Sequence, residues 1–366
     1  MRIGIDARLS GREHAGIGRY IEELLRSLLT IKNEHVWKIF VRKKDQLPWL
    51  KDFTSAEEIV ASVPHYSLQE QLILPSLFSK EHLDLLHVPH FNVPLFYRGK
   101  FVVTIHDLLW HERKDRNATT LSPFMHDLKY HAYRFVAEQA ILRARSVIVP
   151  SNAVASTVKS IVPSVSSVVT IAEGVPDAFT MKVEKANLPK LPFSSPYIVF
   201  VGSLYPHKNA GVLLQVLKQL EEMHLIVVSS RSVFRNTFEA LVHREKLSKR
   251  VHFWGNMSDE GVVSLYQSAL ALVFPSLSEG FGLPGLESMA AGCPVIASSI
   301  PVFHEVYGKA AYFINPHSPE SIVEAIQLLQ QDKIFRNSLV AQGKRQLEKY
   351  SWKKAAEQTL QVYEKV

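Results

Sequence analysis

The sequence contains one cysteine, Cys293, among its 366 residues. A single thiol excludes an intramolecular disulfide and agrees with a reducing compartment. Cys293 lies in an apolar segment beside a predicted helix end, so we expect a buried, inert thiol rather than a nucleophile.

Membrane and metal signals are also missing. No apolar run approaches the roughly 20 residues that a membrane span requires, and Met1–Asp6 is typical of a strand rather than of a signal peptide. The histidines are numerous but show neither the H-E-x-x-H spacing nor the Cys/His spacing of zinc sites. These absences argue against a membrane-spanning protein and against a zinc enzyme.

The charge is moderately basic. A net charge of +7 and a pI near 9.2 favour an anionic partner. The basic residues are scattered and are not interleaved with aromatic ones, so no nucleic-acid partner is expected. Arg113, Lys114 and Arg116 could promote peripheral association with anionic lipid, or they could form an ordinary solvated loop.

The length predicts two domains, and both halves of the chain have the same organisation. Short apolar runs alternate with helical patterns, which indicates an α/β fold with parallel sheets covered on both faces. We expect a Rossmann-like domain over residues 1–177, a proline-containing linker over 178–195 and a second Rossmann-like domain over 196–350. A final helix over 351–366 is expected to pack back toward the first domain.

The segment from Phe274 to Ser299 carries the strongest functional signal. Glu279 should lie on the loop that leaves a buried strand, and Glu287 in about the first turn of the next helix. Pro284 suits the first position of that helix, and Gly292 suits its end. Carboxylates and glycines at the carboxyl edge of a parallel sheet suit an anionic, hydroxyl-rich ligand. Each glutamate alone could simply complement the helix dipole.

The phrases EGFGLP and E-x-M-A-x-G-x-P-V in this segment resemble the E-x7-E signature of retaining nucleotide-sugar glycosyltransferases of family 4. The resemblance runs over nearly the whole chain and implies the GT-B fold, in which two Rossmann-like domains face each other across a cleft. It implies that Glu279 contacts the donor sugar and that Glu287 binds the ribose hydroxyls. The backbone N–H groups of Gly280, Phe281, Gly282 and Leu283 would lie alongside the sugar.

The segment VGSLYPHKN, which follows the first strand of the second half, resembles the family's diphosphate-binding run VG-x-L-x-P-R-K-N. The resemblance makes Lys208 the main diphosphate cation, although a lysine alone in this place would be an ordinary surface residue. The chain departs from the pattern at His207 and at Ser203, where arginine is usual, so the contribution of both to donor binding is open. Arg231 is a weaker candidate for a second cation. The chain has no Asp-x-Asp, which favours a metal-independent site.

In the first half, His106 and Asp107 follow a buried strand. His106 could be a core histidine bonded to a backbone carbonyl, but the family's T-x-H-D segment implies a contact with the donor sugar, with Asp107 as its neighbour or orienter. Gly16 and Gly18 open a predicted helix and, by the same resemblance, approach the donor phosphate. They do not form a dinucleotide fingerprint, because Ile21 stands where the third glycine is needed. A nicotinamide-dependent dehydrogenase is therefore disfavoured.

The sequence thus predicts a metal-independent retaining glycosyltransferase without cofactor. It would transfer a hexose from a nucleotide diphosphate sugar to a glycan or lipid-linked acceptor in cell-surface polysaccharide synthesis. Mannose is the favoured hexose. GDP-mannose is the favoured donor, and a UDP-sugar is the alternative. The expected location is the cytoplasm, at or near the inner face of the membrane. The alternative is a non-catalytic subunit that binds a nucleotide sugar.

Overall fold

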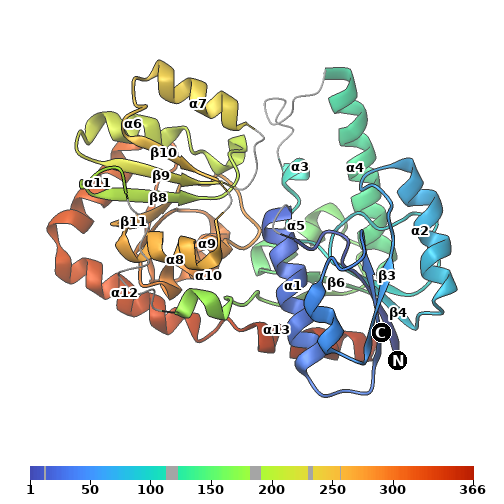
Figure 1. Cartoon of the computed structure of the whole chain (residues 1–366). Coiled ribbons are helices and arrows are strands. Elements are labelled where there is room, and N and C mark those ends of the chain that lie inside the picture. The colour runs from blue at the N-terminus through green and yellow to red at the C-terminus, as the bar shows by residue number, and fades with distance from the viewer. Residues whose placement is uncertain (12–13, 113–122, 182–190, 230–233, 256) are drawn as a thin grey trace. The chain divides into compact units, whose positions relative to one another are not determined.

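The computed structural model describes residues 1–11, 14–112, 123–181, 191–229, 234–255 and 257–366. The chain divides into two compact units (Figure 1). The first unit is Met1–Gly174 together with Trp352–Val366, and the second is Val175–Ser351. Each unit is built on a parallel β-sheet, so the predicted α/β fold with two parallel sheets is confirmed.

In the first unit the described residues form a seven-stranded sheet in the order β3-β2-β1-β4-β5-β6-β7. Its strands are β1 (Arg2–Asp6), β2 (Val36–Val41), β3 (Ala56–Val60), β4 (Leu85–Val88), β5 (Phe101–Thr104), β6 (Ser146–Val149) and β7 (Val168–Thr170). Its α-helices are α1 (Ala15–Thr30), α2 (Leu68–Lys80), α3 (Leu109–Glu112), α4 (Pro123–Arg143), α5 (Asn152–Ile161) and α13 (Trp352–Lys365).

Helix α1 shows why the first unit folds around its sheet. Its apolar residues recur at helical spacing, and four of them are fully buried: Ile21, Leu24, Leu25 and Leu28. They join one cluster with the inner strands and with α13. The last helix of the chain thus belongs to the core of the first unit.

In the second unit the described residues form a six-stranded sheet in the order β10-β9-β8-β11-β12-β13. Its strands are β8 (Tyr197–Val201), β9 (His224–Val228), β10 (Val251–Trp254), β11 (Ala271–Phe274), β12 (Val295–Ser298) and β13 (Ala311–Ile314). Its α-helices are α6 (Val212–Gln219), α7 (Arg235–Arg244), α8 (Asp259–Ser268), α9 (Leu283–Ala290), α10 (Pro301–Tyr307), α11 (Pro319–Gln331) and α12 (Lys333–Leu347).

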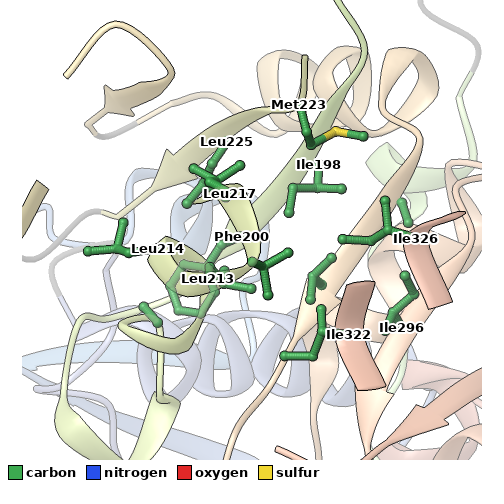
Figure 2. Close-up of a cluster of buried hydrophobic side chains, with 14 of the residues drawn as sticks. Ile198, Phe200, Leu213, Leu214, Leu217, Met223, Leu225, Ile296, Ile322 and Ile326 are labelled. Atoms are coloured by element: carbon green, nitrogen blue, oxygen red, sulfur yellow. The ribbon is translucent and has the colours of Figure 1, made fainter. Parts of the chain in front are cut away.

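One buried apolar cluster joins α6, α7 and α11 to the sheet of the second unit. Figure 2 shows part of it, with Ile198 and Phe200 of β8 beside Leu213 and Leu217 of α6. All four side chains are fully buried. Buried apolar area is the main stabilising term in folding, at roughly 25 cal/mol per Å². This cluster therefore fixes the strands that carry the loops at the carboxyl edge.

The strand β3 was not predicted, for a visible physical reason. It lies at the edge of its sheet, and its residues Glu57 and Glu58 face partly into solvent.

The predicted linker begins within a 3-10 helix, Asp177–Thr180, whose Phe179 is fully buried in the second unit. Residues 182–190 of that linker lie outside the described residues. No described helix is both long and apolar enough to span a bilayer.

Helix α9 approaches α10 closely at Gly285. A methyl group on Gly285 would collide with the ring of Tyr307, which is itself fully buried. The Tyr307 hydroxyl donates a 2.5 Å hydrogen bond to the carbonyl oxygen of Gly282, directly before the helix. Because Gly285 has no side chain, the start of α9 can pack directly against the ring of Tyr307.

We expect Gly285→Ala to lower the free energy of unfolding of the second unit by about 2 kcal/mol, because overpacking a tight contact costs about 1–3 kcal/mol. Gly211→Ala is the matched control. Gly211 has helical φ and ψ, and a methyl group there meets nothing within 4 Å, so it should be neutral or slightly stabilising. Urea denaturation of both variants measures this, and equal stabilities would contradict the tight contact.

Candidate functional site

An ion pair joins two loops at the carboxyl edge of the second sheet. Lys208 ends a 3-10 helix, Pro206–Lys208, that follows β8, and Glu279 follows the neighbouring strand β11. The Lys208 Nζ lies 2.6 Å from Oε1 and 2.7 Å from Oε2 of Glu279. The two side chains are 17% and 10% exposed. Two residues predicted from separate motifs are therefore brought together in space.

Both partners of this pair have further fixed contacts. The Ser276 hydroxyl donates to Oε1 of Glu279 at 2.7 Å. The Lys208 ammonium lies 5.5 Å from the centre of the Phe274 ring, within cation–π range. A cation and a carboxylate held this way cannot move independently, because a change in one alters the contacts of the other.

Asn209 ties the loops of three strands together. Its backbone is left-handed, with φ of 55°, a conformation that asparagine tolerates better than most residues. Its side-chain amide donates to the carbonyl oxygens of Pro275 at 3.2 Å and Pro316 at 2.7 Å. The Leu277 N–H also donates to the carbonyl oxygen of His207 at 2.7 Å. The sequence motif contained Asn209, but a role in holding the loops was not predicted.

Helix α9 differs slightly from the prediction. It begins at Leu283, so Pro284 is its second residue rather than its first. Glu287 is the fifth residue and lies in the second turn, not the first, with an exposed fraction of 5%. The extra residue at the start follows from Gly282, whose φ of 95° lets the chain turn sharply into the helix. Glu287 is therefore a buried side chain rather than a helix-end one.

Tyr307 lies near both glutamates. Burial raises the pKa of its hydroxyl well above the ordinary value, and the negative charges of Glu279 and then Glu287 raise that pKa further. The hydroxyl therefore stays protonated and keeps its hydrogen bond to the Gly282 carbonyl. The charges of both carboxylates of the signature thus act on one buried tyrosine.

The other predicted donor residues of the second unit fall into two groups. Gly280, Phe281 and Leu283 are buried, and the Phe281 ring packs edge-on against Tyr350 at 5.7 Å. Gly280 has no side chain and the side chains of Phe281 and Leu283 are buried, so these residues can serve a ligand only through the backbone.

Ser203 and His207 lie half-buried in the loop after β8. The His207 ring stacks near Tyr205, with 6.0 Å between ring centroids. Arg231 lies outside the described residues.

Cys293 agrees with its prediction. It is 2% exposed, and burial raises the pKa of its thiol to about 12. Because the thiolate is the nucleophilic form, this cysteine is inert at neutral pH.

In the first unit, His106 follows β5, and each of its ring nitrogens lies near an acceptor oxygen. Its Nε2 lies 3.2 Å from the carbonyl oxygen of Pro89, and since a carbonyl only accepts, Nε2 carries the hydrogen. Its Nδ1 lies 3.4 Å from a carboxylate oxygen of Glu173. The Tyr20 ring packs edge-on against it at 4.5 Å. The carbonyl contact is the one expected of a core histidine, whereas the carboxylate contact was not foreseen.

Glu173 is a residue that the sequence prediction missed. It is 6% exposed and follows β7, so it reaches the same sheet edge as His106. A glutamate before Gly174 at the end of a strand was a usable signal, but only the fold pairs it with His106. Asp107, the predicted orienter, instead accepts from the backbone N–H of Leu109 at 3.3 Å, at the start of α3.

The two predicted glycines of the first unit lie in the first turn of α1. A side chain on Gly18 would collide with the carbonyl of Gly11, whereas Gly16 has open space around it.

Among the described residues, no group of three or more His, Cys, Asp or Glu side chains is placed to share a metal ion.

A family comparison covers much of the second unit. Residues 184–346 match the family described as glycosyl transferases group 1. The match identifies this stretch as a group 1 domain. This group 1 domain includes Lys208, Glu279 and Glu287.

Curated relatives extend the match beyond the group 1 domain. The chain is 28% identical over 346 residues to the O-antigen chain mannosyltransferase RfbU of Salmonella typhimurium, a match spanning 92% of this chain and 86% of that protein. It is 32% identical over 172 residues to the O-antigen chain mannosyltransferase B of Escherichia coli, spanning 46% of this chain and 45% of that one.

Solved structures share the whole fold. Sucrose-phosphate synthase from Thermosynechococcus elongatus matches with a TM-score of 0.79 at 21% identity, covering 100% of this chain and 98% of that one. Anabaena HepE, solved in complex with UDP and glucose, matches with a TM-score of 0.78 at 17% identity, with full coverage of both chains. The fold of the whole chain is therefore the GT-B fold of glycosyltransferases.

Two buried histidines beneath this edge of the first unit make its stability depend on pH. Burial lowers the pKa of His87 and of His90 to about 3, and the charge of His106 contributes. An unfolded histidine has a pKa near 6.5. The unfolded chain therefore takes up protons first as the pH falls, so stability present above about pH 6.5 is lost toward pH 3.

We expect the free energy of unfolding of the first unit to fall by about 2 kcal/mol for each of these histidines between pH 7 and pH 5. Urea denaturation at a series of pH values measures the slope. His90→Phe should remove the contribution of His90, about 2 kcal/mol between pH 7 and pH 5, while His131→Phe on the exposed surface of α4 should leave the slope unchanged. A slope that is the same in all three proteins would contradict the assignment.

Proposed function

We propose that the chain is a retaining glycosyltransferase that transfers a hexose from a nucleotide diphosphate sugar to a hydroxyl group of a glycan or lipid-linked acceptor. The observation that carries this proposal is the Lys208–Glu279 ion pair at the edge of a group 1 domain. It supplies one cation and one carboxylate, which are the two groups that a departing diphosphate and a hydroxylated sugar require.

Lys208 is proposed to bind the diphosphate. Negative charge grows on the leaving phosphate as the bond to the sugar breaks, and a fixed cation stabilises that charge. In this structure the ammonium is neutralised by Glu279. A diphosphate would compete for the ammonium and would release carboxylate oxygens of Glu279 toward the sugar hydroxyls.

Glu287 is proposed to bind the ribose. Its carboxylate can accept hydrogen bonds from two vicinal hydroxyl groups. Because the side chain is 5% exposed and lies in the second turn of α9, its position is fixed by packing. A carboxylate already placed in this way loses little entropy when the ligand binds.

The transfer is proposed to proceed on one face of the sugar. The bond from the anomeric carbon to the leaving phosphate oxygen breaks, the bond from that carbon to the acceptor oxygen forms, and the acceptor proton passes to the leaving phosphate. Glu279 is paired to Lys208 and Ser276 and serves here as a hydrogen-bonding group. A trapped glycosyl adduct on Glu279 would overturn this route.

The first unit adds His106 to the proposal, as a hydrogen-bonding group for the donor sugar. The neighbouring carboxylate of Glu173 lies 3.4 Å from its Nδ1 and limits rotation of the ring. Gly16 and Gly18 are still proposed to lie close to the donor phosphate. Asp107 is proposed only as a support of α3, since its carboxylate accepts from Leu109.

Mannose is proposed as the hexose and GDP-mannose as the donor, because the two curated relatives described above are named O-antigen mannosyltransferases. Cell-surface polysaccharide synthesis at the inner face of the cytoplasmic membrane belongs to the same proposal, as does catalysis without a metal. A UDP-sugar is the alternative donor. Thermal-shift assays with GDP-mannose and UDP-sugars separate the donors, since a tightly bound ligand raises the melting temperature.

A non-catalytic subunit that binds the nucleotide sugar is the second candidate. The observation that favours it is the presence of His207 and Ser203 in the diphosphate-binding run. Slow release of GDP from GDP-mannose without any acceptor identifies an enzyme, whereas a binding subunit shows affinity without turnover.

Replacing the two glutamates should have different kinetic effects. We expect Glu279→Ala to lower kcat for GDP release by about 100-fold or more, because it removes a group that acts in the transition state. Glu287→Ala should mainly raise the KM for the donor. Glu324→Ala on the exposed surface of α11 is the control and should behave as wild type. The assignment is wrong if the Glu279 and Glu287 variants both keep wild-type kinetics.

A further inference from the structure

The large apolar side chains that are exposed to solvent are concentrated on two helices of the first unit. On α2, Leu68 and Leu72 are 83% and 68% exposed. On α4, Leu128 and Phe135 are 56% and 55% exposed. The described part of the second unit exposes only two large apolar side chains. Large apolar groups gathered in this way on a surface mark a site of interaction.

The exposed apolar residues of α4 form a regular stripe. Met125, Leu128, Phe135 and Leu142 follow one another at spacings of three and seven residues, so they lie along one side of the helix. Ala137, which is fully buried, lies on the opposite side. A helix that only covers its own sheet carries polar residues on its outer side. The outer side of α4 is therefore apolar without any contribution to the core.

Helices α2 and α4 cover the same face of the first sheet. Leu74 and Phe78 of α2 and Ala137 and Ile141 of α4 are buried in one apolar cluster with β4, β5 and β6. Both helices lie along the same side of the first unit (Figure 1). Because their buried sides meet the same sheet face, their exposed apolar sides both point away from that sheet.

Residues 94–97 link the two helices. The N–H of Leu95 donates to the side-chain oxygen of Gln71 on α2 at 2.7 Å. The Arg143 guanidinium of α4 donates to the carbonyl oxygen of Tyr97. Phe96, between these two bonded residues, is 57% exposed. Its ring therefore adds to the apolar surface between the helices.

We call the surface formed by six of these exposed side chains the α2–α4 face: Leu68, Leu72, Phe96, Leu128, Phe135 and Leu142.

The exposed charges on the elements of the α2–α4 face have one sign. The exposed cations in α2, residues 94–100 and α4 are Lys80, Arg98, Lys100, Lys129 and Arg134. Within the described parts of these three segments, no exposed side chain is acidic. The face is therefore apolar with a basic surround.

Little of this positive charge is neutralised nearby. Arg134 lies 3.1 Å from Glu138, which is half-buried on the same helix. Burial lowers the pKa of Arg143, and the positive charge of Arg98 lowers that pKa further. Two copies of a basic face would repel each other across a two-fold axis. The charge thus favours an anionic partner over a second copy of the chain.

We propose that the α2–α4 face binds an anionic lipid bilayer, an inference that rests on the proposed function because the proposed acceptor is lipid-linked. The apolar side chains would enter the boundary between headgroups and acyl chains, and the surrounding cations would contact lipid phosphates. Arg113, Lys114 and Arg116, from which the sequence predicted lipid association, lie outside the described residues.

The test uses two variants of the full chain, Leu128→Gln combined with Phe135→Gln, and Lys129→Glu. The matched controls lie on α12 of the second unit: Ile334→Gln, at a residue that is 85% exposed, and Lys333→Glu, also exposed. Co-sedimentation is measured with vesicles of phosphatidylglycerol and phosphatidylcholine in equal parts, and with vesicles of phosphatidylcholine alone. Sedimentation velocity without vesicles measures self-association. Melting temperatures, which should match wild type, check that each variant is folded.

We expect wild type to bind the mixed vesicles more tightly than the neutral ones. The variant with both apolar residues replaced should bind the mixed vesicles about tenfold more weakly or worse, because it loses the inserted apolar area. Lys129→Glu should also weaken this binding about tenfold, because it reverses a charge beside an anionic surface. Both controls should bind as wild type. GDP release from GDP-mannose without vesicles should stay within about twofold of wild type in every variant, because none of the replaced residues belongs to the proposed donor site.

Three results would overturn the inference. Wild type does not bind the mixed vesicles, or both variants of the face bind them as tightly as wild type. In the third, wild type is a dimer without vesicles and the variant at Leu128 and Phe135 is a monomer, which would assign the face to a second copy of the chain.

The proposed function fails separately from this inference. If wild type binds mixed vesicles through the α2–α4 face but releases no GDP from GDP-mannose, the lipid site stands and the transferase assignment falls. If wild type releases GDP but binds no vesicles, the transferase assignment stands and the lipid site falls.

Discussion

The ion pair between Lys208 and Glu279 is the contact on which the site of the second unit depends. It joins the loops after two neighbouring strands, and Ser276 and Phe274 hold it in place. Removing either partner leaves a partly buried charge without a counter-charge. The destabilisation that results is larger than the net stabilisation that the pair provides. The pair therefore keeps a cation at the sheet edge, where the proposed function would have a diphosphate replace the carboxylate.

The two glutamates of the signature have different surroundings, and this changes how they are understood. Glu279 lies in a charged network at the edge, whereas Glu287 is packed into the second turn of α9. Tyr307 lies close enough to both for their charges to raise its pKa. These different surroundings agree with the different roles, sugar contact and ribose contact, that are proposed for the two glutamates.

Much of the fold could be predicted from the sequence, because strands such as β5, β8 and β11 are short runs of apolar, aromatic or β-branched residues. The edge strand β3 could not, since its two glutamates break the apolar pattern. The motifs named Lys208, Glu279 and His106, but only strand order places Lys208 beside Glu279 and Glu173 beside His106. Contacts between residues far apart in sequence have no local pattern that a single sequence could show.

The most direct test of the central claim is the affinity for the nucleoside diphosphate, measured by isothermal titration calorimetry with GDP or UDP, whichever binds wild type more tightly. Lys208→Met should weaken that affinity at least tenfold, or about 1.4 kcal/mol, the size expected for a lost charge-assisted hydrogen bond. The control Lys218→Met removes a more exposed lysine paired with Glu245 in the same unit and should bind as wild type. Equal affinities of the Lys208 variant and wild type would contradict the role of the ion pair as the diphosphate site.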